Sequence, residues 1–175
     1  MMNSKPVDDI FNQAIDYAKE SDHEYVTCEH VLLHLLDVDS IAKIIKELSV
    51  DVGNIKEDVS QYLADNEWSG LSNSKIAKGL PKKTQAIERI IQRAVAQVIF
   101  SGRDEIEPID LFVRILSEDN SPAQYYCELN GIDKNVFVDY LENKDTKKKS
   151  LEIVKEYTVN LNQEAMNKKI DPLIG

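Results

Sequence analysis

The chain has 175 residues, 42% of them hydrophobic and 30% charged, which suits one soluble domain with a tail or two very small domains. The formal net charge of −10 repels phosphate backbones, so nucleic acid is not an expected partner unless a local basic face overrides the average. Because there is neither the run of ~20 apolar residues that a membrane-spanning helix needs nor a secretory leader at the start, we expect a cytoplasmic protein that does not bind membranes.

Two amphipathic stripes lie 80 positions apart in the chain. Apolar residues over 7–18 follow the i, i+3, i+4, i+7 spacing of one helix face, and the same pattern returns over 87–98. The apolar run at 31–36 then matches the run at 111–116 with the same offset. The sequence therefore predicts an internal duplication.

Each half is predicted to form four helices, so the expected fold class is all-α, a pseudo-twofold duplicated four-helix repeat. The expected helices lie near 8–21, 27–37, 40–48 and 51–63 in the first half and near 84–101, 108–117, 121–130 and 133–142 in the second. Asn-Gly or Asp-Gly turns between alternating apolar runs are missing, which argues against β-hairpins. Several helix starts carry capping residues or first-turn prolines, namely Thr27, Asp51, Thr84, Pro108, Ser121-Pro122 and Asp133.

The segments outside these helices suggest the domain boundaries. Residues 64–83 contain two glycines and a proline and read as a linker, in which Trp68 is either an anchor on a helix groove or a ligand-stacking ring. The hydrophilic run 144–150 reads as a boundary before a short helix over 151–169, and the apolar Pro-Leu-Ile-Gly end suggests that a larger protein continues. We therefore expect repeat one at 1–63, a linker at 64–83, repeat two at 84–143 and a connecting tail at 144–175.

The motifs of the two halves resemble those of a known family. Residues 23–36, His-Glu-Tyr-Val-Thr-Cys-Glu-His-Val-Leu-Leu-His-Leu-Leu, resemble the first repeat motif of the Clp ATPase N-terminal domain, a polar turn followed by Thr-x-Glu-His-Leu-Leu-x-x-Leu-Leu. Residues 89–94 and 101–106 look like the second repeat of the ClpA type, and residues 107–110, Glu-Pro-Ile-Asp, replace the Gly-Thr-Glu-His of ClpB and ClpC types. Residues 157–162 and 170–175 are similar to the segment that leads into the first AAA+ module.

The resemblance implies a docking domain of a ClpA-type ATP-dependent unfoldase that feeds proteins to a ClpP-type peptidase. A Walker phosphate-binding loop is missing from the chain, so we expect no enzymatic activity and no cofactor here, with ATP and Mg²⁺ bound by the modules that would follow. The implied partners are a ClpS-type adaptor and protein substrates. A ClpB- or ClpC-type N-domain and a free-standing Clp-repeat regulator are the alternatives.

Five polar residues at the helix starts are candidates for adaptor binding. Arg89 and Arg93 are i, i+4 neighbours opposite the apolar stripe of their helix, Thr84 caps that helix, and Glu24 and Glu29 flank the start of the second helix. In a pseudo-symmetric repeat these elements can form one mixed-charge surface. Spacing alone favours an ordinary solvated face with weak ion pairs, whereas the resemblance implies that this surface docks ClpS.

The histidines and cysteines are candidates for chemical sites. His30 and His34 lie at i, i+4 with His23 in the preceding turn, a weak candidate zinc site that would make a hydrolase the remote alternative. The other interpretation has His30 hydrogen-bonded near a helix start and His34 facing solvent. Cys28 and Cys127 lack CxxC spacing, and we expect two reduced thiols in the core.

Overall fold

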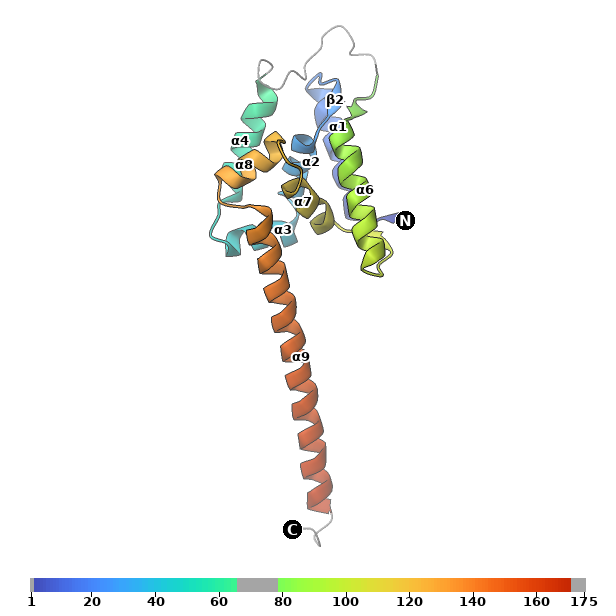
Figure 1. Ribbon diagram of the computed structural model, residues 1–175, viewed down its shortest axis with the longest axis vertical. Coiled ribbons are helices and arrows are strands. Elements are labelled where there is room, and N and C mark those ends of the chain that lie inside the picture. The colour runs from blue at the N-terminus through green and yellow to red at the C-terminus, as the bar shows by residue number, and fades with distance from the viewer. Residues whose placement is uncertain (1, 66–78, 171–175) are drawn as a thin grey trace. The chain divides into compact units, whose positions relative to one another are not determined.

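The computed structural model describes residues 2–65 and 79–170, with side chains over 3–65 and 79–156. Within these ranges the chain forms eight helices and four strands of two residues each (Figure 1). Trp68 and the Pro-Leu-Ile-Gly end lie outside the described residues. The elements of the first repeat are β1 (Met2–Asn3), α1 (Lys5–Glu20), β2 (Tyr25–Val26), α2 (Cys28–Leu35), α3 (Asp39–Glu47) and α4 (Val52–Ala64). Those that follow are β3 (Lys82–Lys83), α6 (Gln85–Phe100), β4 (Glu105–Ile106), α7 (Pro108–Leu116), α8 (Pro122–Leu129) and α9 (Lys134–Ile170).

The helix starts agree with the predicted capping residues. The side chains of Asp51, Thr84 and Ser121 accept hydrogen bonds from the backbone N–H groups of Gly53, Ile87 and Gln124, at 2.8, 3.4 and 3.1 Å. Pro108 begins α7 and Pro122 begins α8, where a proline lacks only an N–H that would be unpaired anyway. Local sequence signals therefore fix where most of these helices begin.

The predicted apolar stripes form the core of the two repeats. Residues 80 positions apart are buried in pairs, so each repeat contributes the same face of each helix. The two central helices show this best, because Leu32 and Phe112 are both fully buried. Other pairs buried in this way are Val7 and Ile87, Ile10 and Ile90, Ala14 and Ala94, Ala18 and Val98, Leu35 and Ile115, and Leu36 and Leu116.

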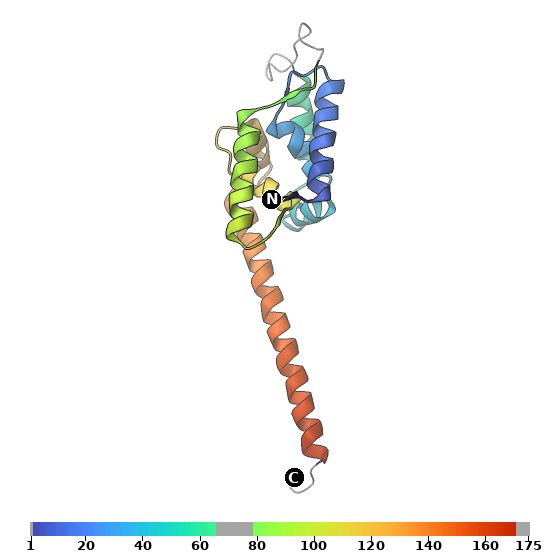
Figure 2. The same ribbon diagram turned by 90° about the vertical axis from the view of Figure 1, so that its right-hand side faces the viewer.

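Two parallel strand pairs join the repeats, in addition to the predicted helices. Met2 pairs with Glu105 in β1–β4, and Tyr25 pairs with Lys82 in β2–β3. The 80-residue offset relates the two pairs, because Met2 corresponds to Lys82 and Tyr25 corresponds to Glu105. The two strand pairs are therefore equivalent under the duplication. In each pair a strand that precedes or follows helices of one repeat is hydrogen-bonded to a strand of the other half of the domain. Helices α1 and α6 run in opposite directions (Figure 2). Parallel pairs need no hairpin turn, so they leave no turn signal in the sequence.

The long helix α9 corrects the expectation of a break at 144–150. It runs without interruption from Lys134 to Ile170 (Figure 1). The chain divides into two compact units, Met1–Lys134 and Asn135–Gly175, and nearly all of α9 belongs to the second. The hydrophilic run contains no glycine or proline, and lysine and glutamate are good helix formers. High polarity therefore marks an exposed helix here. Within the described residues no helix has both the length and the apolar character that crossing a membrane requires.

Candidate functional site

The β2–β3 pair brings the starts of α2 and α6 together. The backbone N–H of Lys82 donates to the carbonyl oxygen of Glu24 at 3.0 Å, and that of Thr84 donates to Val26 at 3.3 Å. Helix α2 begins directly after β2, and α6 begins directly after β3. Two of the predicted site residues, Glu24 and Thr84, therefore flank the same strand pair, at its opposite ends, although they are 60 apart in the chain.

Both predicted arginines of α6 bind one acidic side chain. Arg89 donates to Oε1 of Glu118 through Nε at 3.1 Å and through Nη2 at 2.5 Å, and Arg93 donates to Oε2 through Nη1 at 3.3 Å. Glu118 follows the end of α7, and only 7% of its side chain is exposed, whereas the arginine side chains are 49% and 51% exposed. We call Arg89, Arg93 and Glu118 the arginine cluster.

The arginine cluster carries a positive surplus on an acidic protein. Two guanidinium groups face one carboxylate, so one positive charge is left at a surface of a chain whose net charge is −10. Because both arginines keep about half of their surface in solvent, they can contact a partner while Glu118 holds them in position. Glu118 cannot be predicted from the sequence, because it lies 29 positions after Arg89 and 25 after Arg93, and no helical spacing rule links residues that far apart.

Glu29 is placed differently from the expectation. It is only 4% exposed, and its Oε1 accepts a hydrogen bond from the backbone N–H of Ala123 at 3.0 Å, at the start of α8. A carboxylate at a helix N-terminus satisfies an otherwise unpaired donor and interacts favourably with the helix dipole. Glu29 therefore joins the repeats from inside and is not an exposed contact residue.

The interior next to this surface is strongly charged. Burial raises the pKa of the Cys28 thiol, the charges of Glu29 and Glu118 raise it further, and Arg89 opposes them. The thiol is thus kept protonated and unreactive. Burial raises the pKa of Cys127 to about 12, and both cysteines are free and buried, as predicted.

The histidines form a hydrogen-bonded chain. The backbone N–H of Thr27 donates to Nδ1 of His30 at 2.9 Å, so the ring proton of His30 lies on Nε2, which is 2.8 Å from Nδ1 of His23. His23 in turn hydrogen-bonds the backbone of Leu63 at the end of α4. Burial lowers the pKa of His30 to about 3 and also lowers that of His23, so both rings are neutral.

This chain of hydrogen bonds has a structural role. It confirms the expectation that His30 bonds near a helix start, and it uses the ring nitrogens that a metal would need. Within the described residues no group of three or more histidine, cysteine, aspartate or glutamate side chains could hold a metal ion. His34 does not face solvent as expected, because it is half-buried and its Nε2 is a buried atom without a hydrogen-bond partner.

The comparisons with known proteins agree with this architecture. The model of the Clp repeat (R) N-terminal domain matches residues 2–129, and the chain therefore belongs to the family of N-terminal domains of Clp ATPases. The described helices up to α8, the reciprocal strand pairs and the buried cap at His30 lie inside the matched range, and α9 begins after it.

Several curated proteins are similar in sequence. The chain is 27% identical to a ClpA homolog protein of Fuscovulum blasticum over 197 aligned positions, which cover 98% of this chain and 25% of the relative. It is 28% identical to the chaperone protein ClpB of Staphylococcus aureus strain MW2, over 89% of this chain and 17% of the relative. The chain thus spans a quarter or less of the length of these relatives.

Solved structures show the same fold. The N-terminal domain of Hsp104 from Candida albicans superimposes with a TM-score of 0.69 at 10% identity, over 80% of this chain and 89% of that one. The N-terminal domain of the chaperone ClpD from Arabidopsis thaliana gives a TM-score of 0.60 at 17% identity, over 82% and 94%. At these identities the likeness concerns the fold alone.

Proposed function

We propose that this chain is the adaptor- and substrate-docking domain of a ClpA-type ATP-dependent unfoldase that delivers proteins to a ClpP-type peptidase. The observation that carries the proposal is the arginine cluster, because it presents two half-exposed guanidinium groups on α6, the helix that Thr84 caps directly after the strand paired with β2. Membership of the Clp N-domain family and the ClpA homolog among the relatives support it.

The proposed mechanism is docking without catalysis. A domain that holds an adaptor or a substrate near the entrance of an ATPase ring raises its effective concentration there, and no chemical step is needed in the domain itself. Glu118 fixes both arginines before a partner arrives, so less side-chain entropy is lost on binding. The partner surface should then offer carboxylates to Arg89 and Arg93.

The test is calorimetric titration of the 175-residue chain with a purified ClpS-type adaptor. The parent should bind, and Arg93→Glu should weaken binding by about tenfold or more, because the new carboxylate faces Glu118 and repels an acidic partner. Lys43→Glu on α3 is the matched control, since it makes the same charge reversal at an exposed position on a different helix from Arg93. Absence of binding by the parent, or equal losses in both variants, would refute the adaptor proposal.

A ClpB-type chaperone is the second candidate, and the relative from Staphylococcus aureus favours it. An N-domain of that kind would bind an unfolded protein directly. Binding of a denatured model protein by a parent chain that ignores the ClpS-type adaptor would support this alternative. In both cases ATP should leave the melting temperature of the chain unchanged, because nucleotide binding would belong to other modules.

A further inference from the structure

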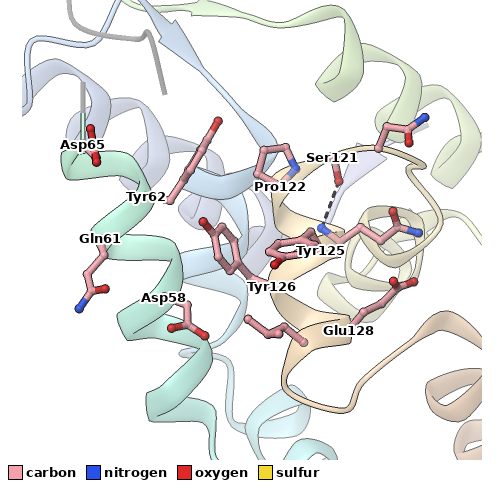
Figure 3. A pocket seen from close by; sticks show the side chains of 12 residues that line it. Asp58, Gln61, Tyr62, Asp65, Ser121, Pro122, Tyr125, Tyr126 and Glu128 are labelled. Atoms are coloured by element: carbon pink, nitrogen blue, oxygen red, sulfur yellow. Dashed lines mark hydrogen bonds between the residues drawn. The ribbon is translucent and has the colours of Figure 1, made fainter. Parts of the chain in front are cut away.

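A groove lies between α4 and α8, on residues that the proposed adaptor surface does not use. The two helices contact each other, and the groove has a volume of about 810 Å³. This lies within the range of pockets that hold small ligands, so it can take a few residues of a peptide. Figure 3 shows side chains of both helices projecting into it. We call it the α4–α8 groove.

Three tyrosines with neighbouring rings line the groove. The ring of Tyr126 lies 5.8 Å from that of Tyr62 on α4 and 5.1 Å from that of Tyr125, tilted by 54° and 72°. Tyr125 is 57% exposed, so one aromatic surface is available to a partner (Figure 3). Burial raises the pKa of Tyr62 and of Tyr126, so the hydroxyl groups stay protonated. Tyrosine rings attract cations to their faces.

The charged side chains that line the groove are acidic. Asp58, Asp65 and Glu128 line it, and the described lining residues include no lysine, arginine or histidine. The charges of Asp58 and Asp65 contribute, after burial and Tyr125, to the raised pKa of Tyr126, so the carboxylates act on the centre of the groove. Such a surface repels phosphates and acidic peptides and attracts a guanidinium or ammonium group.

The groove is held in shape before any partner binds. The side-chain amide of Asn130 donates to Oδ2 of Asp58 on α4 at 2.9 Å and to the backbone oxygen of Tyr126 on α8 at 2.8 Å. Glu29 fixes the start of α8 through Ala123. One side chain thus bridges the two walls, and a preformed site loses little entropy when it is occupied.

We propose that the α4–α8 groove is a second docking surface, for an extended protein segment that carries an arginine side chain next to an apolar residue. The guanidinium would stack on Tyr125 and bind Glu128, because a planar cation can satisfy a ring face and a carboxylate together. The apolar neighbour would cover Leu129, which is 61% exposed at the edge of the groove. Arginine fits better than lysine, because an ammonium group is more strongly hydrated and does not stack.

The test uses fluorescence anisotropy with a labelled, unstructured peptide that contains two arginines flanking a leucine. Its matched control carries citrulline at both positions, which keeps the shape and removes the charge. The 175-residue chain should bind the arginine peptide about tenfold more tightly than the citrulline peptide, as expected for charge-assisted hydrogen bonds, and raising the salt concentration from about 50 to about 500 mM should weaken binding.

Variants then locate the site. Tyr125→Ala and Glu128→Gln should each weaken binding by about threefold to tenfold, in line with a lost cation–aromatic contact or ion pair. Glu88→Gln on α6 removes the same charge from an exposed position outside the groove and should have no effect. Arg93→Glu should also leave this binding unchanged, so the groove and the adaptor surface can fail separately. Circular dichroism and melting temperature check that each variant is folded.

Several outcomes would overturn the proposal. Equal affinity for the arginine and citrulline peptides would show that charge recognition is absent, and equal losses in Glu88→Gln and Glu128→Gln would show only a general attraction to an acidic protein. Absence of binding up to about 1 mM peptide, a concentration that detects very weak complexes, would remove the site altogether.

Discussion

The two repeats secure the start of their second helix with the same geometry and different chemistry. In the first repeat the backbone N–H of Thr27 donates to Nδ1 of His30 at 2.9 Å, and in the second the N–H of Glu107 donates to Oδ2 of Asp110 at 2.8 Å. Both pairs form a capping box, and the members lie 80 positions apart. A duplicated fold has thus kept the hydrogen bond and exchanged the residue that accepts it.

A third residue contacts each capping box, and this residue also differs between the repeats. His23 bonds His30 in the first repeat, while the equivalent Arg103 binds Asp110 through two hydrogen bonds of 3.1 and 2.6 Å in the second. His30 is fully buried and His23 is 6% exposed, whereas 42% of the Arg103 side chain is exposed. A neutral pair avoids the desolvation of charges in the interior, and an ion pair suits a position that water reaches. Burial therefore decides which chemistry each repeat uses.

The largest expected difference between the two capping boxes is the pH dependence of their contribution to the free energy of unfolding. In the folded state the pKa of His30 is about 3, chiefly because of burial and then because a protonated His30 would be repelled by His23 and His34 when they are protonated, while an unfolded histidine titrates near 6.5. The unfolded state therefore binds more protons below pH 6.5, so the free energy of unfolding should fall by about 2 kcal/mol from pH 7 to pH 5 through His30. Well above pH 6.5 the unfolded histidine is also neutral, and this contribution becomes constant. Urea unfolding at each pH measures it.

His30→Gln provides the control for this titration. Glutamine can accept from Thr27 and donate to His23 but does not titrate, so the variant should be less stable at pH 7 and should lose less stability on acidification. The lowered pKa values of His23 and His34 leave a residual slope, again through burial in both cases. A His30 ring that titrates near pH 6.5 in an NMR experiment would contradict the prediction.

Breaking the ion pair of the second repeat should have a smaller effect. Arg103→Met keeps the aliphatic stem and removes the two hydrogen bonds to Asp110, which should lower the free energy of unfolding by about 1 kcal/mol because the pair is partly exposed. Arg114→Met on α7 is the matched control, since it removes the same charge from the same repeat. Urea unfolding at low and high salt checks this, and equal losses in both variants would assign the effect to net charge.

The smallest expected difference concerns the turns that end α1 and α6. Asp22 and Gly102 occupy equivalent positions with φ of 55° and 72°, a region that side chains disfavour. Gly102→Ala should lower the free energy of unfolding by about 1 kcal/mol, whereas Asp22→Gly should change it by a few tenths, since aspartate tolerates this conformation. Thermal melts of the two variants give the comparison. A larger loss for Asp22→Gly would mean that its side chain has a further role.

The sequence allowed the duplicated helices to be predicted because their signals are local. The apolar stripes, Thr84 and Ser121 act within one or two turns, so spacing alone locates them. The unbroken course of α9 does not follow from the sequence pattern, because a polar run is compatible with a linker and with an exposed helix. Local signals thus predict where helices begin better than where they end.

The candidate site was only partly predictable. Spacing and the family resemblance together predict Arg89 and Arg93 as site residues, but the position of Glu118 and the burial of Glu29 depend on how the repeats pack. The strand pairs also depend on residues about 100 and about 60 positions apart, which no local rule connects. Tertiary contacts therefore account for what the sequence left open.

The reciprocal strand pairs have a consequence for synthesis of the chain. Because β1 pairs with β4, the first residues of the domain cannot complete their hydrogen bonds until a segment about 100 residues later has left the ribosome. At translation rates of roughly 5–20 residues per second, synthesis of these residues takes about 5–20 seconds, and during this time β1 has no partner strand. High contact order of this kind slows folding, so the duplication links both halves into one late folding event.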